Sequence, residues 1–430
     1  MNSKRFLLSA ASGLCLAAAA LFSILVFSCG QKESRLVLKT NSVEFVSFAE
    51  LFNSSQDKIK IVVHYQEEPC KNLGAKEAAK DSERPDILAG SYLQAGIEKK
   101  CFSRLDSLIK KNGPIDKNSF YPALLQTGRL NEKQYLLPVS FNLPALVFDP
   151  KNYESLQEQA MLSFDDIKNL SKKFNVKNRD GIYSAMGFGP LWSPDFLYLV
   201  FKDMGVFFNA GPHSIIYTEN VFLKSKDFVR DWIQEVNGGA KNEQDFAFKY
   251  LYMPFYSQAQ SGRCLFSYAT SRQIFSLSQD QIRDLDFRWI CNDGRIQIED
   301  DFVSVGVYAK SKKKAAAKKF IAWLMSEEAQ RKILDRKLKM NLDSNSFGIA
   351  GGFSALQIVT ERLFPLYYRS LLSNTPVSSL LFAPQKFPGD WAKIKALALE
   401  PFILDSVSAT NSKAATLSER YEALLASEAK

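Results

Sequence analysis

A chain of 430 residues is long for one hydrophobic core, so two domains are expected. Its 46% hydrophobic and 23% charged residues are typical of a folded globular protein and exclude a disordered one. The formal net charge of +9 is small for this length, and lysines such as Lys110 and Lys111 come in scattered pairs, which argues against a nucleic-acid-binding face.

The N-terminus predicts export. Lys4 and Arg5 precede an apolar run, Phe6–Phe27, of the kind found in secretory leaders. The run ends just before Cys29, and the glycine after this cysteine resembles a bacterial lipobox. We expect residues 1–28 to be a lipoprotein signal peptide and Cys29 to carry acyl chains such as palmitate, since more than one chain anchors a protein stably. An uncleaved signal anchor is the alternative. Either way, the body lies in the periplasm or on the cell exterior, tethered to a bacterial membrane.

Strands and helices alternate in the first part of the mature chain. Leu36–Thr40, Ile59–Tyr65 and Pro85–Gly90 have the apolar, β-branched composition of buried strands. Strands that are apolar throughout are typical of a parallel α/β sheet covered on both faces. Because ligands bind such sheets at the carboxyl ends of the strands, Asn41–Ser42 and Ser91–Tyr92 are candidate contacts.

An extended apolar stretch, Tyr135–Pro150, is interrupted by Pro138 and Pro144, so it is not one regular central strand. A buried but broken segment is what a crossing between two lobes requires. Asp301–Ala309 is a second apolar stretch, which we expect to bring the chain back. Two crossings predict two lobes joined by a hinge.

A second alternation of elements lies between the two crossings. We expect a helix over Phe164–Phe174, a helix that begins at Ser193–Asp195, and strands over Gly262–Ala269 and Phe287–Cys291. Beyond the return crossing, a further helix starts at Ser311.

Four cysteines follow Cys29, and an exported compartment permits them to form disulfides. They allow three pairings, and the sequence does not choose among these or free thiols: Cys70, Cys101, Cys264 and Cys291. No C-x-x-C occurs, and His64 and His213 are the only histidines, so no zinc site is expected.

Four segments, in this order, resemble the extracellular solute-binding proteins of ABC importers, in particular the carbohydrate-binding group that includes the maltose-binding protein. The four segments are Pro85–Ile87, the crossing strand within Gly128–Phe148, Gly262–Ala269, and Ser304–Ala329 with its lysine-rich turn and Ala-Ala-x-x-Phe-Ile helix. Together they span most of the mature chain.

The resemblance implies an α/β, two-lobe periplasmic-binding-protein fold of type II, with discontinuous lobes, a hinge and a ligand cleft between them. The expected divisions are a signal peptide at 1–28, a lipidated cysteine and tether at 29–35, an N-terminal lobe of 36–143 plus 303–345, and a C-terminal lobe of 144–302 plus 346–430.

The same resemblance implies the substrate-binding component of an ABC transporter. It captures a small solute, most simply a carbohydrate, by hinge closure and delivers it to the membrane permease and its ATPase. Such a receptor works as a monomer and carries out no bond chemistry, so no cofactor, no catalytic residue and no metal are expected.

The family's cleft positions fall on polar and aromatic residues of this chain: Asn41, Ser91, Tyr92 and Asn142 beside the first lobe, and Trp192 and Trp391 in the second. Sugar C–H groups pack on aromatic faces while amides bond to hydroxyls, so this mixture suits a carbohydrate. Two alternatives remain open: Trp192 contacts its own helix start, or Trp391 is a core residue of an amphipathic helix with Ile394 and Leu397.

One position departs from the sugar-binding pattern. Where the family often has an aromatic residue, this chain has Arg272 at a predicted helix start. A cation beside free backbone N–H groups suits a phosphate or carboxylate, so Arg272 keeps open an anionic solute such as a sugar phosphate. The alternative is a solvated arginine on the rim of a lobe.

Two other classes of function have weaker signals in the sequence. Glu299–Asp301 is a carboxylate cluster, but three adjacent acids alternate in direction along a strand, and the chain has no Gly-x-Ser-x-Gly, His-Glu-x-x-His or Walker motif. An enzyme is therefore not expected. A surface adhesin that keeps the fold without transport is a further alternative.

Overall fold

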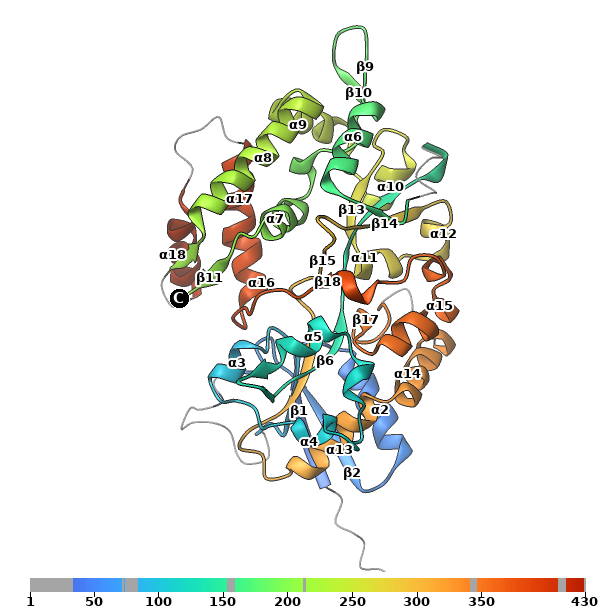
Figure 1. Ribbon diagram of the computed structural model, residues 1–430, viewed down its shortest axis with the longest axis vertical. Coiled ribbons are helices and arrows are strands. Elements are labelled where there is room, and N and C mark those ends of the chain that lie inside the picture. Colours follow the sequence, from blue (N-terminus) through green and yellow to red (C-terminus); the bar gives the residue numbers. More distant parts are fainter. Residues whose placement is uncertain are drawn as a thin grey trace, which may run out of the picture.

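The computed structural model describes residues 34–71, 73, 84–152, 159–211, 214–340, 346–408 and 415–428. The expected signal peptide and the expected lipidation site, Cys29, lie outside the described residues. The described chain forms two α/β lobes, one above the other in Figure 1, each built on its own sheet. No helix in these ranges is long and apolar enough to cross a membrane.

The first lobe is built on a sheet that has six strands within the described residues, in the order β17-β6-β16-β3-β1-β2. The strands are β1 (Ser34–Thr40), β2 (Ile59–Tyr65), β3 (Ile87–Ser91), β6 (Leu137–Phe141), β16 (Val303–Val307) and β17 (Phe353–Ser354). β1 runs parallel to β2 and β3, as the sequence predicts, but β16 is antiparallel to β3 and β6. The sheet is therefore mixed.

Helices cover this sheet on both faces, as the uniformly apolar strands predict (Figure 1). They are α2 (Phe45–Ser55), α3 (Ala95–Glu98), α4 (Asp106–Ile109), α5 (Pro122–Thr127), α13 (Lys314–Leu324) and α14 (Glu327–Lys339). Packing is close enough at β16 to require a glycine, because a Cβ on Gly306 would lie 2.6 Å from Phe102 Cδ1.

The second lobe contains a smaller sheet of order β13-β7-β14-β8 in the part of the chain that is described. Its strands are β7 (Pro144–Phe148), β8 (Met161–Leu162), β13 (Ser267–Thr270) and β14 (Asp286–Ile290). Around it lie α6 (Phe164–Phe174), α7 (Pro194–Asp203), α8 (Glu219–Asn237), α9 (Ala240–Tyr250), α10 (Phe255–Gln260), α11 (Ser271–Phe275) and α12 (Gln279–Ile282).

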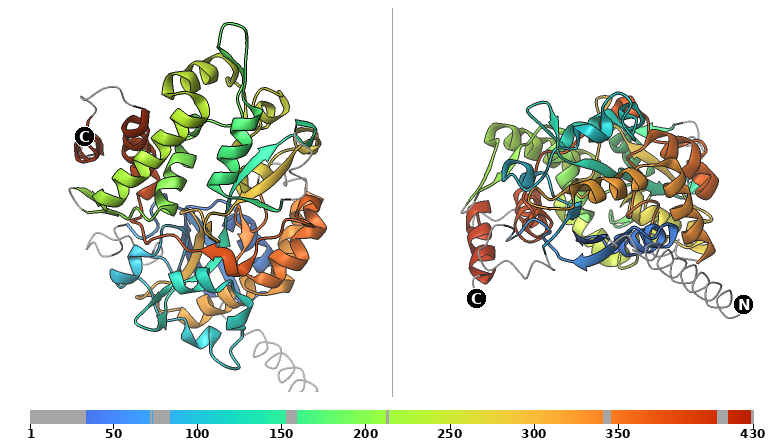
Figure 2. Two further views of the ribbon diagram at one scale, coloured as in Figure 1. Left: turned by 45° about the horizontal axis from the view of Figure 1, so that its top comes forward. Right: turned by 90° about the horizontal axis from the view of Figure 1, so that it is seen from below.

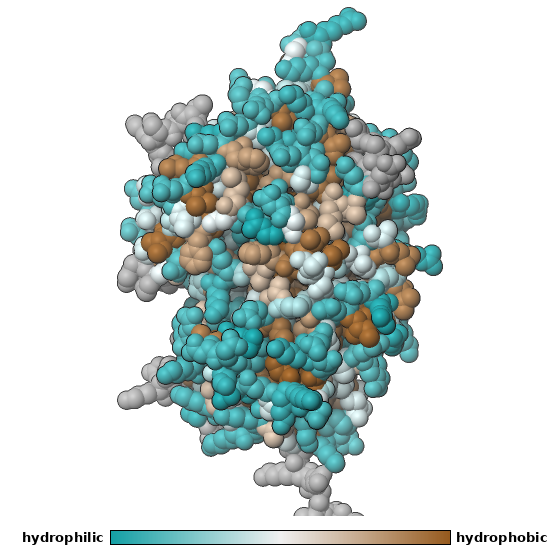
Figure 3. All heavy atoms as spheres, viewed as in Figure 1, coloured by the Kyte–Doolittle hydropathy of each residue, from teal (hydrophilic) through white to brown (hydrophobic). Residues whose placement is uncertain are grey.

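The last part of the chain completes the second lobe. It comprises α16 (Trp391–Ile394), the π-helical turn η9 (Lys395–Leu399), α17 (Glu400–Ser408) and α18 (Leu417–Glu428). α17 packs beside α7 and α8, and α18 lies at the outer flank of this lobe (Figures 1 and 2). In the space-filling view, both ends of the molecule are mostly hydrophilic, and hydrophobic residues gather toward the middle of the face (Figure 3).

The chain passes between the lobes where the sequence predicts the first crossing. β6 belongs to the first sheet and β7 to the second, and Asn142 and Leu143 join them. The return segment lies beside this crossing, since the Glu299 backbone N–H donates to the Asn142 carbonyl at 3.0 Å. The two segments therefore meet at one place, where a hinge can act.

One expected boundary needs correction. The sequence assigned residues 346–430 to the second lobe, but β17 pairs with β6 in the first sheet. The reason is packing, because the ring of Phe353 on β17 lies 5.6 Å from the ring of Phe141 on β6. This contact holds β17 at the edge of the first sheet, although the segment around it has the composition of a linker. Residues from α16 onward pack in the second lobe.

Candidate functional site

A hollow of about 380 Å³, here called the cleft hollow, opens between the lobes. Its walls come from the end of β3, the two crossings, the start of α7, the β13–α11 turn and η9. The residues that line it are Tyr92, Asn142, Asp195, Thr270, Arg272, Gln273, Glu299, Asp300, Asp301, Ala392, Lys395, Ala396 and Glu400.

A second hollow of about 270 Å³ adjoins it on the side of the first lobe. Asn41 and Ser91 line this second hollow, and Arg272 lines both, so the two share one wall. Three of the seven sequence candidates line the cleft hollow: Tyr92, Asn142 and Arg272. Two others, Asn41 and Ser91, line the adjoining hollow.

Asn41 and Ser91 are positioned by each other. The Ser91 backbone N–H donates to Asn41 Oδ1 at 3.0 Å, and Ser91 Oγ donates to the Asp301 carbonyl at 2.6 Å. The close approach needs Gly90, with φ of 133°, since a Cβ there would lie 1.9 Å from Asn41 Oδ1. These groups already have partners, so they shape the hollow's wall and its backbone.

Asn142 is buried in the first crossing, and its amide is satisfied, as a polar group inside an apolar strand must be. Its Nδ2 donates to the Gly351 carbonyl at 3.0 Å, and its Oδ1 accepts from Ser271 Oγ at 2.7 Å. Gly351 lies just before β17 of the first sheet, and Ser271 begins α11 of the second lobe. The side chain thus links both lobes at the hinge.

Arg272 is paired within the protein. Its NH1 lies 2.9 Å from Asp301 Oδ2, and its Nε donates to the Gly351 carbonyl at 2.9 Å. The positive charge of Arg272 was the reason to consider an anionic solute. In the structure, a carboxylate in the same wall balances this charge.

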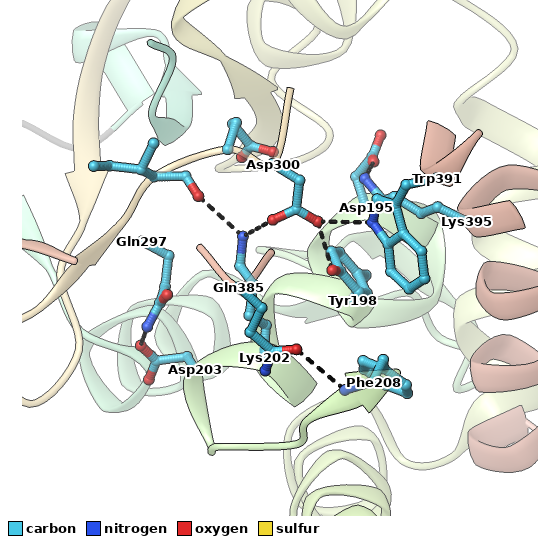
Figure 4. A network of polar contacts seen from close by, with 12 residues as sticks. Asp195, Tyr198, Lys202, Asp203, Phe208, Gln297, Asp300, Gln385, Trp391 and Lys395 are labelled. Carbon is cyan, nitrogen blue, oxygen red and sulfur yellow. Dashed lines mark hydrogen bonds and ion pairs between the residues drawn. The ribbon is translucent and has the colours of Figure 1, made fainter. Parts of the chain in front are cut away.

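A buried carboxylate holds the floor of the cleft hollow together. Asp300 is 4% exposed, and it accepts from Lys202 Nζ at 3.0 Å, Tyr198 OH at 2.5 Å and Trp391 Nε1 at 3.2 Å (Figure 4). Burial raises the pKa of Asp300, but the charges of Lys202 and Lys395 outweigh it and hold the pKa below its ordinary value. Asp300 thus ties the return crossing to α7 and α16.

Lys395, at the start of η9, forms a second charged group in the lining. Its Nζ lies 2.7 Å from Asp195 Oδ1 and 3.2 Å from Glu400 Oε1. Burial raises the pKa of Glu400 to about 7 despite the lysine, whereas the Lys395 charge outweighs burial at Asp195 and lowers its pKa.

Glu299 differs from its neighbours. Its Oε1 accepts from Tyr268 OH at 3.2 Å, and no cation within the described residues lies at ion-pair distance. Burial raises its pKa to about 6. Among the described residues that line the cleft hollow, five are carboxylic acids and two are cations, and both cations are already paired. The hollow is therefore an acidic, hydrogen-bond-accepting surface.

The two tryptophans predicted to stack on a sugar are not in the cleft hollow. Trp192 lines a separate hollow of about 360 Å³ beside α9, where it stacks on Phe246 at 5.4 Å and donates from Nε1 to the Glu243 carbonyl. Trp391 is 0% exposed because Phe387 stacks on its ring at 4.1 Å. Trp391 is therefore a core residue, as its core alternative expected, and Ile394 is buried with it, but Leu397, the third residue of that alternative, is 58% exposed.

Several lining residues were not singled out from the sequence. Asp195 had a usable signal, because it stands in the first turn of a predicted helix, three residues after Trp192. Lys395 and Glu400 had none, since their approach depends on the π-helical turn η9, which brings residues five apart together. Among the described residues, no group of three or more histidines, cysteines or acids is arranged to hold a metal ion.

One comparison with known proteins identifies a family for this chain. The family model described as bacterial extracellular solute-binding protein matches residues 47–338. No curated protein sequence matches the chain.

Solved structures match over nearly the whole chain at low sequence identity. A cyclo/maltodextrin-binding protein complexed with maltotetraose is 13% identical, with a TM-score of 0.60 over 93% of this chain and 98% of that one. The maltose-binding periplasmic protein MalE from Listeria monocytogenes, in complex with maltose, is 13% identical, with a TM-score of 0.58 over 92% and 99%. CpMnBP1 with mannotriose bound is 16% identical, with a TM-score of 0.54 over 93% and 100%.

Proposed function

Since this chain belongs to the bacterial extracellular solute-binding proteins, we propose that it feeds an ABC importer with a neutral oligosaccharide held in the cleft hollow. The observation that carries the proposal is the lining of this hollow. It joins both lobes at the hinge and offers carboxylate acceptors beside a tyrosine face, which suits a solute rich in hydroxyl groups.

The charged side chains that line the cleft hollow favour a neutral solute over an anionic one. A phosphate or carboxylate would face five acidic side chains, while Arg272 is held by Asp301 and Lys395 by Asp195 and Glu400. Displacing these partners costs free energy that an anion has to repay, whereas a hydroxyl group can donate to Glu299, which has no cation at ion-pair distance within the described residues. This favours the neutral sugar over the sugar phosphate.

Similar folds hold related solutes. Three solved structures of the same fold carry maltotetraose, maltose and mannotriose. All three solutes are neutral oligosaccharides, which supports the solute class for this chain and leaves the sugar unit open. The proposed contacts are Tyr92, Asn142 and Arg272 with Asp195 and Glu299; Asn41 and Ser91 frame the adjoining wall.

The two crossings between the lobes form a hinge, which allows the lobes to close on a solute. A solute that contacts Tyr92 of the first lobe and Asp195 of the second interacts more strongly when the lobes are close, so it shifts the equilibrium toward the closed form. The closed form is what docks on the permease.

We also propose that Cys29 is acylated after cleavage of residues 1–28, which tethers the body at the membrane. A Cys29→Ala variant of the full chain is expected to leave the membrane fraction. Retention of that variant on membranes with its leader intact would support the uncleaved signal anchor instead.

Thermal unfolding of the protein, screened against three solute classes, tests the solute assignment. A solute at a hundred times its dissociation constant stabilises the folded protein by about 2.7 kcal/mol, which raises the melting temperature. We expect a rise with a neutral gluco- or manno-oligosaccharide and none with its phosphorylated form. A rise with sugar phosphates alone would overturn the neutral assignment, and a rise with amino sugars alone would mean that Glu299 binds an ammonium group.

A further inference from the structure

Two of the four cysteines meet beside the first lobe. Cys70 lies in the turn after β2, and Cys101 follows α3. A Cβ on Gly96 would lie 2.9 Å from Cys70 Sγ and 3.6 Å from Cys101 Cβ, so both side chains reach the same small residue. The two thiols lie close enough for each to shift the pKa of the other.

The other two cysteines have no such neighbour. Cys264 is fully buried, and its thiol donates to the Gln258 carbonyl at 3.2 Å; Cys291 follows β14 in the second lobe. Of the three pairings that the sequence left open, the fold brings together only Cys70 with Cys101 among the described residues.

The backbone of Cys101 is already fixed. The Cys101 N–H donates to the Gly96 carbonyl at 2.9 Å, and the Cys101 carbonyl accepts from the Ala309 N–H at 2.8 Å. Both cysteines pack against an apolar cluster that contains Leu93 and Phe102. Little chain entropy is therefore left to lose when the two sulfurs join.

We propose that Cys70 and Cys101 form a disulfide in the exported protein. The structure holds both as free thiols, and the family's extracellular location supplies a compartment in which disulfides persist. The bridge would tie the β2 turn to α3 and so fix the intervening turn of Tyr92, which lines both the cleft hollow and the hollow beside the cysteines.

The two thiols have different roles in forming the bond. The neighbouring Cys70 thiol and the charge of Lys99 lower the pKa of Cys101 to about 7, while the neighbouring Cys101 thiol raises the pKa of Cys70. Cys101 is also the less buried thiol, so its thiolate is the nucleophile that meets an oxidant.

The oxidant required is a disulfide donor of the cell exterior. The Cys101 thiolate attacks one donor sulfur and expels the other as a thiolate, which leaves a mixed disulfide. Cys70, having given up its proton, attacks the Cys101 sulfur and releases the second donor sulfur. The protein thiols lose two electrons and two protons in total, and the donor disulfide gains them to become two thiols.

Alkylation of the exported full chain tests the bond directly. The protein is quenched in acid, denatured, treated with iodoacetamide without reductant and digested for mass spectrometry. We expect one cross-linked peptide pair containing Cys70 and Cys101, and alkylated Cys264 and Cys291. Alkyl groups on both Cys70 and Cys101, or a bridge from either to another cysteine, would overturn the proposal.

A melting experiment gives a second, independent readout. Reductant is expected to lower the melting temperature of the unaltered protein and of Cys291→Ser by about 4 °C. It should leave the Cys70→Ser/Cys101→Ser double variant unchanged. Equal sensitivity in all three proteins, or in none, would contradict the bond; if the double variant does not fold, the peptide analysis still decides.

Discussion

Replacing Asp300 with alanine is expected to lower the free energy of unfolding by about 3–5 kcal/mol, because it leaves the buried ammonium group of Lys202 without its carboxylate. The same change removes the acceptor of Tyr198 OH and Trp391 Nε1, two donors that then have no partner in a dry site. Urea denaturation of the variant and the unaltered protein measures the difference.

The neighbouring residue is a matched control. Asp301 pairs with Arg272, but a third of its side chain is exposed, so Asp301→Ala should cost less than about 1 kcal/mol. A Lys202→Met/Asp300→Leu double variant removes both buried charges and should recover part of the loss. Equal effects of Asp300→Ala and Asp301→Ala would contradict the role given to the buried network.

Replacing Ala396 with tryptophan is expected to weaken oligosaccharide binding at least tenfold, which corresponds to about 1.4 kcal/mol, without lowering the melting temperature of the free protein. Ala396 is exposed on η9 and lines the cleft hollow, so an added indole ring takes up the space of a sugar ring without entering the core. Titration calorimetry measures the affinity, and the solute-free melting curve checks the fold.

Leu397 offers the control for this change. It lies on the same turn and is 58% exposed, but it does not line the cleft hollow. Leu397→Trp should therefore keep the affinity of the unaltered protein, which separates blockage of the hollow from a general effect of a bulky residue on η9.

The crossings and the strand ends were predictable because their signals are local. β1, β3 and β16 each contain a buried apolar run, which indicates cover on both faces, and the two prolines of the first crossing mark where one strand becomes two. The strand ends placed Tyr92 near the cleft, and the family resemblance added Asn142. β17 gave no such signal, since two residues inside a glycine-rich segment do not make a pattern.

The charged partners of the site were not predictable from spacing. Arg272 meets Asp301 and Lys395 meets Asp195 only because separate elements fold together. The three acids at 299–301 looked like a polar start to a strand, and their alternation is what directs Asp300 into the core while Glu299 and Asp301 remain half-buried.

Aromatic residues were the least reliable guide. Trp391 has the helical spacing of a core residue and the family position of a stacking residue, and burial against Phe387 decides between them in the fold. Trp192 lies in its own aromatic hollow, stacked on Phe246, at a place that the sequence could not separate from the cleft.

The central claim is that a neutral oligosaccharide binds between the lobes in the cleft hollow. Its most direct test is to titrate one oligosaccharide from the thermal screen into the unaltered protein, Ala396→Trp and Leu397→Trp, side by side in a calorimeter. The account predicts that Ala396→Trp alone loses affinity, by at least tenfold. Equal affinity in all three proteins would place the solute outside the cleft hollow and contradict the claim.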